Sequence, residues 1–132
     1  MSGAVKLSIL MPVYNEARTV QAVVKRVLDV DFPCPVEVVI VDDASTDATA
    51  EILSHLDDER LVKLRHPVNR GKGAAIRTAV AAATGDFMVP LDADLEYLPE
   101  EIPKLLEPVL SGEAEVVYGS RSFGSHASYS FW

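Results

Sequence analysis

The chain has 132 residues, which is enough for one domain with a single hydrophobic core. Its net charge of −8 argues against nonspecific binding to nucleic acid, and its single cysteine, Cys34, excludes a disulfide framework or a multi-cysteine zinc site. The sequence has no signal-peptide core and no apolar run of the ~20 residues that cross a bilayer. We therefore expect a cytoplasmic protein, whose membrane contact is peripheral or is carried by further sequence.

Strands and helices are predicted to alternate along the chain. In chain order, we expect a strand at 6–11, a helix at 19–30, a strand at 36–41, a helix from 45 or 46 to about 56, a strand at 61–64, a helix at 74–83, an apolar strand from 87, a helix that begins at 99–101 and a strand at 116–120. Pro12 is expected to end the first strand. This alternation predicts an α/β fold, with a mostly parallel sheet and helices on both of its faces.

The strand that begins at residue 87 ends in a cluster of acids. Asp92, Asp94 and Glu96 occupy alternate positions, so an extended chain would point all three to one side. Two carboxylates about 4 Å apart repel each other by roughly 4 kcal/mol at an effective dielectric constant near 20. A divalent cation such as Mg²⁺ or Mn²⁺, which prefers oxygen ligands, would offset that repulsion. Taken alone, an Asp-x-Asp motif is more typical of a solvated acidic turn after a strand.

Polar residues also follow the other predicted strands. In open α/β sheets, ligands bind beyond the carboxyl ends of the strands. The polar strand ends are residues 12–16, 42–45, 92–96 and 119–121. Because these segments meet at one edge of a parallel sheet, together they predict a binding site there.

Four motifs, taken together, resemble the large inverting glycosyltransferase family 2. They are PVYNE at 12–16, VDDASTD at 41–47, NRGKG at 69–73 and DAD at 92–94, in the order and spacing of that family. The DLE at 94–96, followed by Pro99, Glu100 and the GSR at 119–121, is most similar to the dolichol-phosphate mannosyltransferase and polyprenyl-phosphate glycosyltransferase branch. The resemblance covers nearly the whole chain. It implies a GT-A fold, of which residues 1–132 would be the nucleotide-sugar-binding part of a domain truncated at its C-terminus.

The resemblance also implies a role for individual residues. The residues expected to bind the nucleotide sugar are Pro12, Tyr14, Glu16, Asp42, Asp43, Lys72 and Asp92. Among these, Asp42 would contact the base, and Asp92 would lie near the ribose or the diphosphate. Asp94 would bind the metal that bridges the two phosphates. Glu96 would complete the metal shell at a position that is often Gln in this branch, and Arg121 would meet a phosphate.

The implied reaction is metal-dependent transfer of a hexose, such as mannose or glucose, from a UDP- or GDP-sugar to a polyprenyl or dolichyl phosphate. A cation that bridges both phosphates stabilises the charge of the departing nucleoside diphosphate. A lipid phosphate is largely ionised at neutral pH, so it needs no strong general base. A hydroxyl acceptor would need a carboxylate base, and the sequence has none after Glu115.

Several alternatives remain open at this stage. Residues 69–73 suit either a donor-side loop or a simple helix entry, Glu16 suits a helix entry, and Asp43 could orient the turn at 45–47. Arg121 could pair with a neighbouring acid, and the three histidines, His55, His66 and His126, are expected at the surface. The rival functions are a phosphoacceptor receiver domain, a nucleotidyltransferase, and a fragment that binds nucleotide sugar without transferring it.

Overall fold

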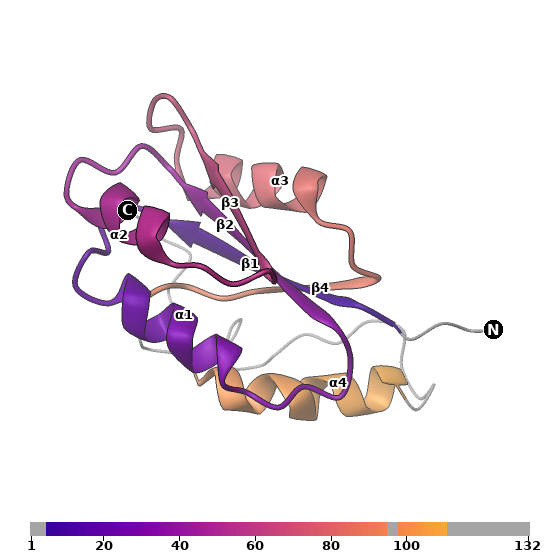
Figure 1. Ribbon diagram of the computed structural model, residues 1–132. Helices are drawn as coiled ribbons and strands as arrows, with labels where there is room; N and C mark the ends of the chain where they lie inside the picture. Colours follow the sequence, from indigo (N-terminus) through magenta and orange to yellow (C-terminus); the bar gives the residue numbers. More distant parts are fainter. Residues whose placement is uncertain (1–4, 95–97, 111–132) are drawn as a thin grey trace.

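The fold is built around a four-stranded parallel sheet. The computed structural model describes residues 5–94 and 98–110. The strands are β1 (Leu7–Val13), β2 (Val36–Asp42), β3 (Leu61–Arg65) and β4 (Phe87–Pro90). They lie in the order β3-β2-β1-β4, and every neighbouring pair is parallel (Figure 1). The predicted α/β class with a mostly parallel sheet is confirmed, whereas the strand expected at 116–120 lies outside the described residues.

Helices cover both faces of this sheet. They are α1 (Val20–Leu28), α2 (Thr49–His55), α3 (Lys72–Ala82) and α4 (Ile102–Leu110), and α4 is preceded by the 3₁₀ turn η1 (Pro99–Glu101). On one face, α1, α2 and α4 pack against a core that includes Ile9 and Ile40. On the other face, the small residues Ala75 and Ala79 of α3 pack against Val39. Figure 1 shows α3 on the opposite side of the sheet from α1 and α4.

The interior of the sheet explains why its sequence is so apolar. All seven residues of β1 are buried, because this central strand is covered on both faces and paired on both sides. Each of its buried Leu, Ile, Met and Val side chains contributes roughly 1.5–3 kcal/mol when it leaves water. The two central strands, β1 and β2, are therefore mostly continuous apolar runs, as expected for buried parallel strands. The edge strand β3 instead alternates apolar residues with Lys63 and Arg65 and is only partly buried.

Several element boundaries differ from the sequence expectation: α1 ends at Leu28, two residues early, and α3 begins at Lys72, inside the segment expected to be a loop. The end of β1 and the start of α2 also differ, and the structure shows why. β1 continues through Pro12 to Val13. The backbone of Leu10, two residues earlier, faces β4, where its carbonyl accepts the N–H of Leu91, and the pairing with β4 reaches no further than Pro90. The backbone of Pro12 faces the same side as that of Leu10, but β4 does not extend that far. In the part of the chain that the structure describes, no strand is therefore left without a hydrogen bond because Pro12 lacks an N–H group.

The second boundary is the start of α2, at Thr49 rather than near residue 45. The side-chain oxygen of Asn15 accepts the N–H groups of Thr46, at 2.8 Å, and Asp47, at 3.3 Å. These bonds hold the segment before α2 as a turn against the end of β1. A carboxylate oxygen of Asp47 then accepts the N–H of Thr49 at 2.9 Å, so the helix begins there.

The register of the sheet aligns the carboxyl ends of three strands. Val13 of β1 pairs with Asp42 of β2, which pairs with Arg65 of β3. The residues that follow β1, β2 and β3 therefore leave the sheet at the same edge. No helix among the described residues is long and apolar enough to cross a bilayer.

Candidate functional site

Three acids converge at the carboxyl edge of the sheet. Glu16 lies in the loop between β1 and α1, and Asp92 and Asp94 follow β4. Partial burial and the nearby negative charges of Asp94 and Asp92 together raise the pKa of Glu16 to about 7. A partly buried carboxylate whose ionised form is disfavoured by neighbouring acids is a place that a cation would stabilise.

Threonine side chains fix the two segments that carry these acids. The hydroxyl of Thr19 donates to the carbonyl of Ala93 at 2.6 Å, which ties the entry of α1 to the residue between the two aspartates. The N–H of Glu16 donates to the hydroxyl of Thr49 at 3.0 Å. The positions of Glu16 and Asp94 therefore depend on contacts between residues more than 30 positions apart.

The positively charged side chain of a lysine reaches the same edge from the helix on the other face of the sheet. Lys72, the first residue of α3, places its Nζ 2.7 Å from a carboxylate oxygen of Asp92, and both side chains are mostly buried. This ion pair joins the start of α3 to the end of β4. It also brings the NRGKG segment beside the acidic segment.

Asp43, which follows β2, holds the segment before α3. Its side chain is fully buried, and its carboxylate accepts the N–H of Arg70 at 2.9 Å and that of Gly71 at 2.8 Å. The same carboxylate contacts Nδ1 of His66 at 2.7 Å. His66 is 5 % exposed, so the expectation that it lies at the surface is wrong. In the turn at 45–47, the side-chain oxygen of Asn15 accepts the N–H groups of Thr46 and Asp47.

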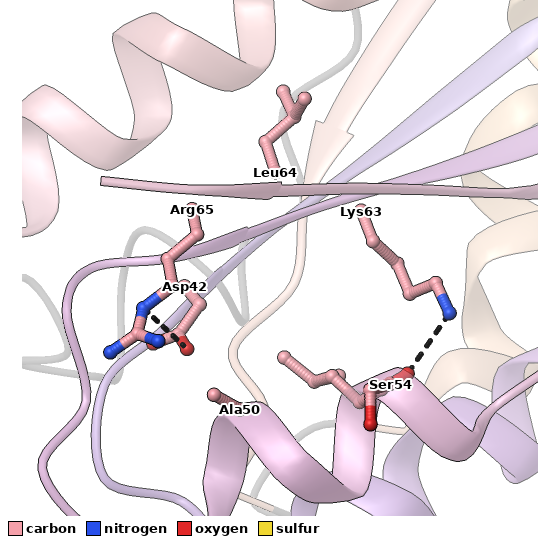
Figure 2. Close-up of a pocket in the computed structure, with 7 residues that line it drawn as sticks. Asp42, Ala50, Ser54, Lys63, Leu64 and Arg65 are labelled. Atoms are coloured by element: carbon pink, nitrogen blue, oxygen red, sulfur yellow. Dashed lines mark hydrogen bonds and ion pairs between the residues drawn. The ribbon is translucent and has the colours of Figure 1, made fainter. Parts of the chain in front are cut away.

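Asp42 borders a separate cavity of about 360 Å³ between α2 and β3, which Figure 2 shows. One of its carboxylate oxygens accepts the N–H of Ser45 at 3.0 Å. The other is buried without a hydrogen-bond partner, and Nε of Arg65 lies 3.7 Å away from it. A buried carboxylate oxygen without a hydrogen bond is costly, and it suits an N–H donor supplied by a ligand.

The remaining predicted site residues are placed as follows. Pro12 is buried near the end of β1, and Tyr14 is half-buried just after it, on the edge that carries Glu16. The predicted metal ligand Glu96 and the predicted phosphate contact Arg121 lie outside the described residues. Within residues 5–94 and 98–110, no three His, Cys, Asp or Glu side chains come close enough to hold a metal ion among them.

Sequence reasoning missed three residues that organise this edge: Asn15, Thr19 and His66. Asn15 has a positive φ of 54°, which Asn tolerates better than most residues, and its place between Tyr14 and Glu16 was a usable signal. The sequence carries no comparable signal for Thr19 and His66. Their partners are Ala93, Asp43 and Thr78, which only the folded chain brings near them.

Solved structures with this arrangement are GT-A glycosyltransferases. The mannosyltransferase of Pyrobaculum calidifontis, solved with GDP-Man and Mn²⁺, matches with a TM-score of 0.65 and 30% identity, over 81% of this chain and 34% of that one. Glucosyl-3-phosphoglycerate synthase of Mycobacterium tuberculosis, solved with Mn²⁺, UDP and glucosyl-3-phosphoglycerate, matches with a TM-score of 0.66 and 29% identity, over 83% and 41%. The fold and the acidic edge therefore define a GT-A glycosyltransferase domain.

The chain belongs to glycosyl transferase family 2, whose model matches residues 8–132. It is 35% identical to a dolichol-phosphate mannosyltransferase of Pyrococcus furiosus, over 88% of this chain and 33% of that protein. It is 34% identical to an undecaprenyl-phosphate 4-deoxy-4-formamido-L-arabinose transferase of Pectobacterium carotovorum, over 80% and 34%. The chain thus spans about a third of the length of these relatives, and the predicted membership of the family is confirmed.

Proposed function

We propose that the protein takes part in metal-dependent transfer of a hexose, with inversion, from a UDP- or GDP-sugar to a polyprenyl or related lipid phosphate. Membership of family 2 and the similarity to two lipid-phosphate sugar transferases support this class of reaction. Because the chain spans about a third of those relatives, the activity is proposed for the protein of which this domain is the donor-binding part.

The observation that carries the proposal is the convergence of Glu16, Asp92 and Asp94 at the carboxyl edge of the sheet, with the pKa of Glu16 raised to about 7. Hard divalent cations favour carboxylate oxygens, and the mutual repulsion of these acids falls when a cation binds. Asp94, together with Glu96, would hold Mg²⁺ or Mn²⁺. Two structural neighbours were solved with Mn²⁺.

The chemistry at this edge is that of charge stabilisation. Asp94 and Glu96 would hold a divalent cation, which would supply positive charge to stabilise the departing nucleoside diphosphate. Lys72, which already lies 2.7 Å from Asp92, adds a fixed positive charge on the same side. Arg121 is proposed to hold a phosphate through its planar guanidinium, which can donate two hydrogen bonds.

The base of the donor is proposed to lie toward Asp42, with Pro12 and Tyr14 beside the base and ribose. The Asp42 oxygen that lacks a hydrogen bond supports this, because uracil and guanine both carry a ring N–H that can donate to a carboxylate. Arg65, 3.7 Å from that oxygen, is a donor for the adjacent ring carbonyl. Both bases fit this pattern, so the choice between UDP and GDP is left to measurement.

The proposal is tested by calorimetric titration of the purified chain with UDP and with GDP, in Mn²⁺ and then in EDTA. We expect one nucleotide to bind in Mn²⁺ and its affinity to fall at least tenfold in EDTA. If a folded chain binds neither, a titration of a longer chain that includes the C-terminal sequence separates an incomplete site from a wrong assignment.

A matched pair of variants localises the metal. Asp94→Asn should lower the Mn²⁺-dependent affinity by about 100-fold, or roughly 2.7 kcal/mol, without loss of the fold. Asp57→Asn removes one exposed carboxylate away from this edge and should leave the affinity unchanged. Equal affinity of the folded Asp94→Asn variant and the wild type would rule out the metal assignment. If the longer chain binds the nucleotide but transfers no sugar, a protein that only binds nucleotide sugar is favoured.

A further inference from the structure

His66 is a buried polar side chain that the proposed chemistry does not use directly. It follows β3, and its side chain is 6 % exposed. Its Nδ1 lies 2.7 Å from a carboxylate oxygen of Asp43, and its Nε2 lies 2.8 Å from the hydroxyl of Thr78 in α3. Both ring nitrogens are therefore satisfied by partners in two different elements, which fixes the plane and position of the imidazole.

The directions of these hydrogen bonds follow from the partners. The oxygens of Asp43 accept the N–H groups of Arg70 and Gly71, so the carboxylate acts as an acceptor and Nδ1 of His66 donates to it. In the neutral imidazole, Nε2 is then the acceptor for the Thr78 hydroxyl. His66 thus supplies Asp43 with a hydrogen-bond donor at a buried place.

The Asp43 carboxylate transmits this constraint to the loop before α3. Its two oxygens accept consecutive backbone N–H groups, while its backbone carbonyl accepts Nδ2 of Asn69 at 3.2 Å. Gly71 has a φ of +96°, a backbone conformation that residues other than Gly rarely adopt. The loop is therefore held in a specific, uncommon conformation, and Lys72 follows it directly.

We propose that His66 is a positioning residue for the donor diphosphate. Through Asp43 it orders residues 69–71, and this order sets Lys72 against Asp92 at the acidic edge. The inference rests on the proposed function for the identity of the ligand, whereas the ordering of the loop by His66 is independent of it. Without the imidazole, the carboxylate loses a donor, the loop loosens, and Lys72 no longer has a fixed position beside the diphosphate.

Two substitutions of His66 separate the contact to Asp43 from the contact to Thr78. The side-chain amide of Asn matches the position of Nδ1, so His66→Asn retains a donor to Asp43. The longer Gln places its amide near the position of Nε2, so His66→Gln retains the contact to Thr78 and loses the contact to Asp43. The two variants remove similar apolar volume, and each serves as the control for the other.

The first measurement is backbone hydrogen exchange at Arg70 and Gly71 in the chain without nucleotide. We expect exchange about tenfold faster in His66→Gln than in the wild type, and within about threefold of the wild type in His66→Asn. A tenfold change corresponds to about 1.4 kcal/mol, the size expected for one hydrogen bond to a charged group. Wild-type exchange in a His66→Gln variant with an unchanged thermal unfolding profile would overturn the inference.

The second measurement is the affinity for UDP, GDP, UMP and GMP in Mn²⁺. For the nucleotide that the wild type binds, His66→Gln should weaken the diphosphate about tenfold and the monophosphate less than twofold. Equal weakening of both would point to general loosening of the fold and would overturn the positioning role. If neither this chain nor the longer chain binds a nucleotide, the proposed function fails, and the exchange rates alone decide whether His66 orders the loop.

If His66→Gln does not fold, Thr78→Val provides the test, because it removes one anchor of the imidazole while leaving the ring and its volume in place. We expect several-fold faster exchange at Arg70 and Gly71 in this variant. Wild-type exchange and wild-type affinity for the diphosphate in Thr78→Val would overturn the inference.

Discussion

The pKa values of two acids, one at each end of the sheet, are shifted in opposite directions. At the amino end, Glu37 of β2 is 6 % exposed and accepts hydrogen bonds from the hydroxyl of Ser8 and the N–H of Thr84, each at 2.6 Å. Burial by itself would raise the pKa of Glu37, but these hydrogen bonds and the nearby Lys6 lower it. At the carboxyl end, burial and neighbouring aspartates raise the pKa of Glu16 to about 7.

This difference separates an acid that stabilises the fold from acids that suit a ligand. Glu37 is surrounded by donors that the chain itself supplies, and it joins β1, β2 and the turn before β4. Glu16 is partly buried near the negative charges of Asp94 and Asp92, so this place favours a cation from outside the chain. The amino end should therefore control stability, whereas the carboxyl end should control ligand affinity.

The largest expected effect on stability is at Gly85, beside the Glu37 cluster. A Cβ at this position would lie 2.8 Å from the backbone nitrogen of Ser8 and 2.9 Å from the carbonyl oxygen of Lys6, both too close. Gly85→Ala should lower the free energy of unfolding by about 3 kcal/mol, measured by denaturant titration. The control is Gly73→Ala in α3, where the nearest atom is Nη1 of Arg77 at 3.4 Å. It should gain up to about 1 kcal/mol.

A smaller loss is expected when the charge of Glu37 is removed. Glu37→Gln keeps the shape of the side chain but weakens its charge-assisted hydrogen bonds with Ser8 and Thr84, at a cost of about 2 kcal/mol in the free energy of unfolding. The affinity for nucleotide should stay within about twofold of the wild type. A variant with wild-type stability and impaired nucleotide binding would contradict the division between the two ends.

The smallest expected effect is a gain in stability at high pH when Glu16 is replaced by Gln. Its folded pKa of about 7 lies above the ordinary value of 4.5, so between these pH values the folded state binds more protons than the unfolded state. The free energy of unfolding therefore falls as pH rises from 4.5 to 7. Glu16→Gln should remove this dependence and stabilise the metal-free chain at pH 8 by about 1 kcal/mol, after allowance for solvent screening.

Denaturant titrations at pH 4.5 and pH 8 in EDTA measure that effect. At pH 4.5 the variant and the wild type should be similar, because the carboxyl group is largely protonated in the folded state. Addition of Mn²⁺ at pH 8 should then stabilise the wild type more than the variant. A constant stability difference between the two pH values would mean that Glu16 is not perturbed by its neighbours.

The sequence alone predicted the α/β class, the alternation of elements and the edge of the sheet at which the candidate residues gather. Each of these depends on local patterns: apolar runs such as residues 36–41, helical spacing such as that of α1, and acids directly after strands. It misplaced the start of α2 and the end of β1, because the contacts of Asn15 and the early end of β4 are tertiary features.

The tertiary structure alone decided how the polar residues are paired. The sequence drew attention to Asp42, Asp43, Lys72 and Asp92, but it did not distinguish the fully buried Asp43, which anchors the loop before α3, from Asp42 with its unpartnered oxygen. It also placed His66 at the surface. A pKa and a hydrogen-bond partner depend on the distance between side chains that lie tens of residues apart in the chain, and only folding sets that distance.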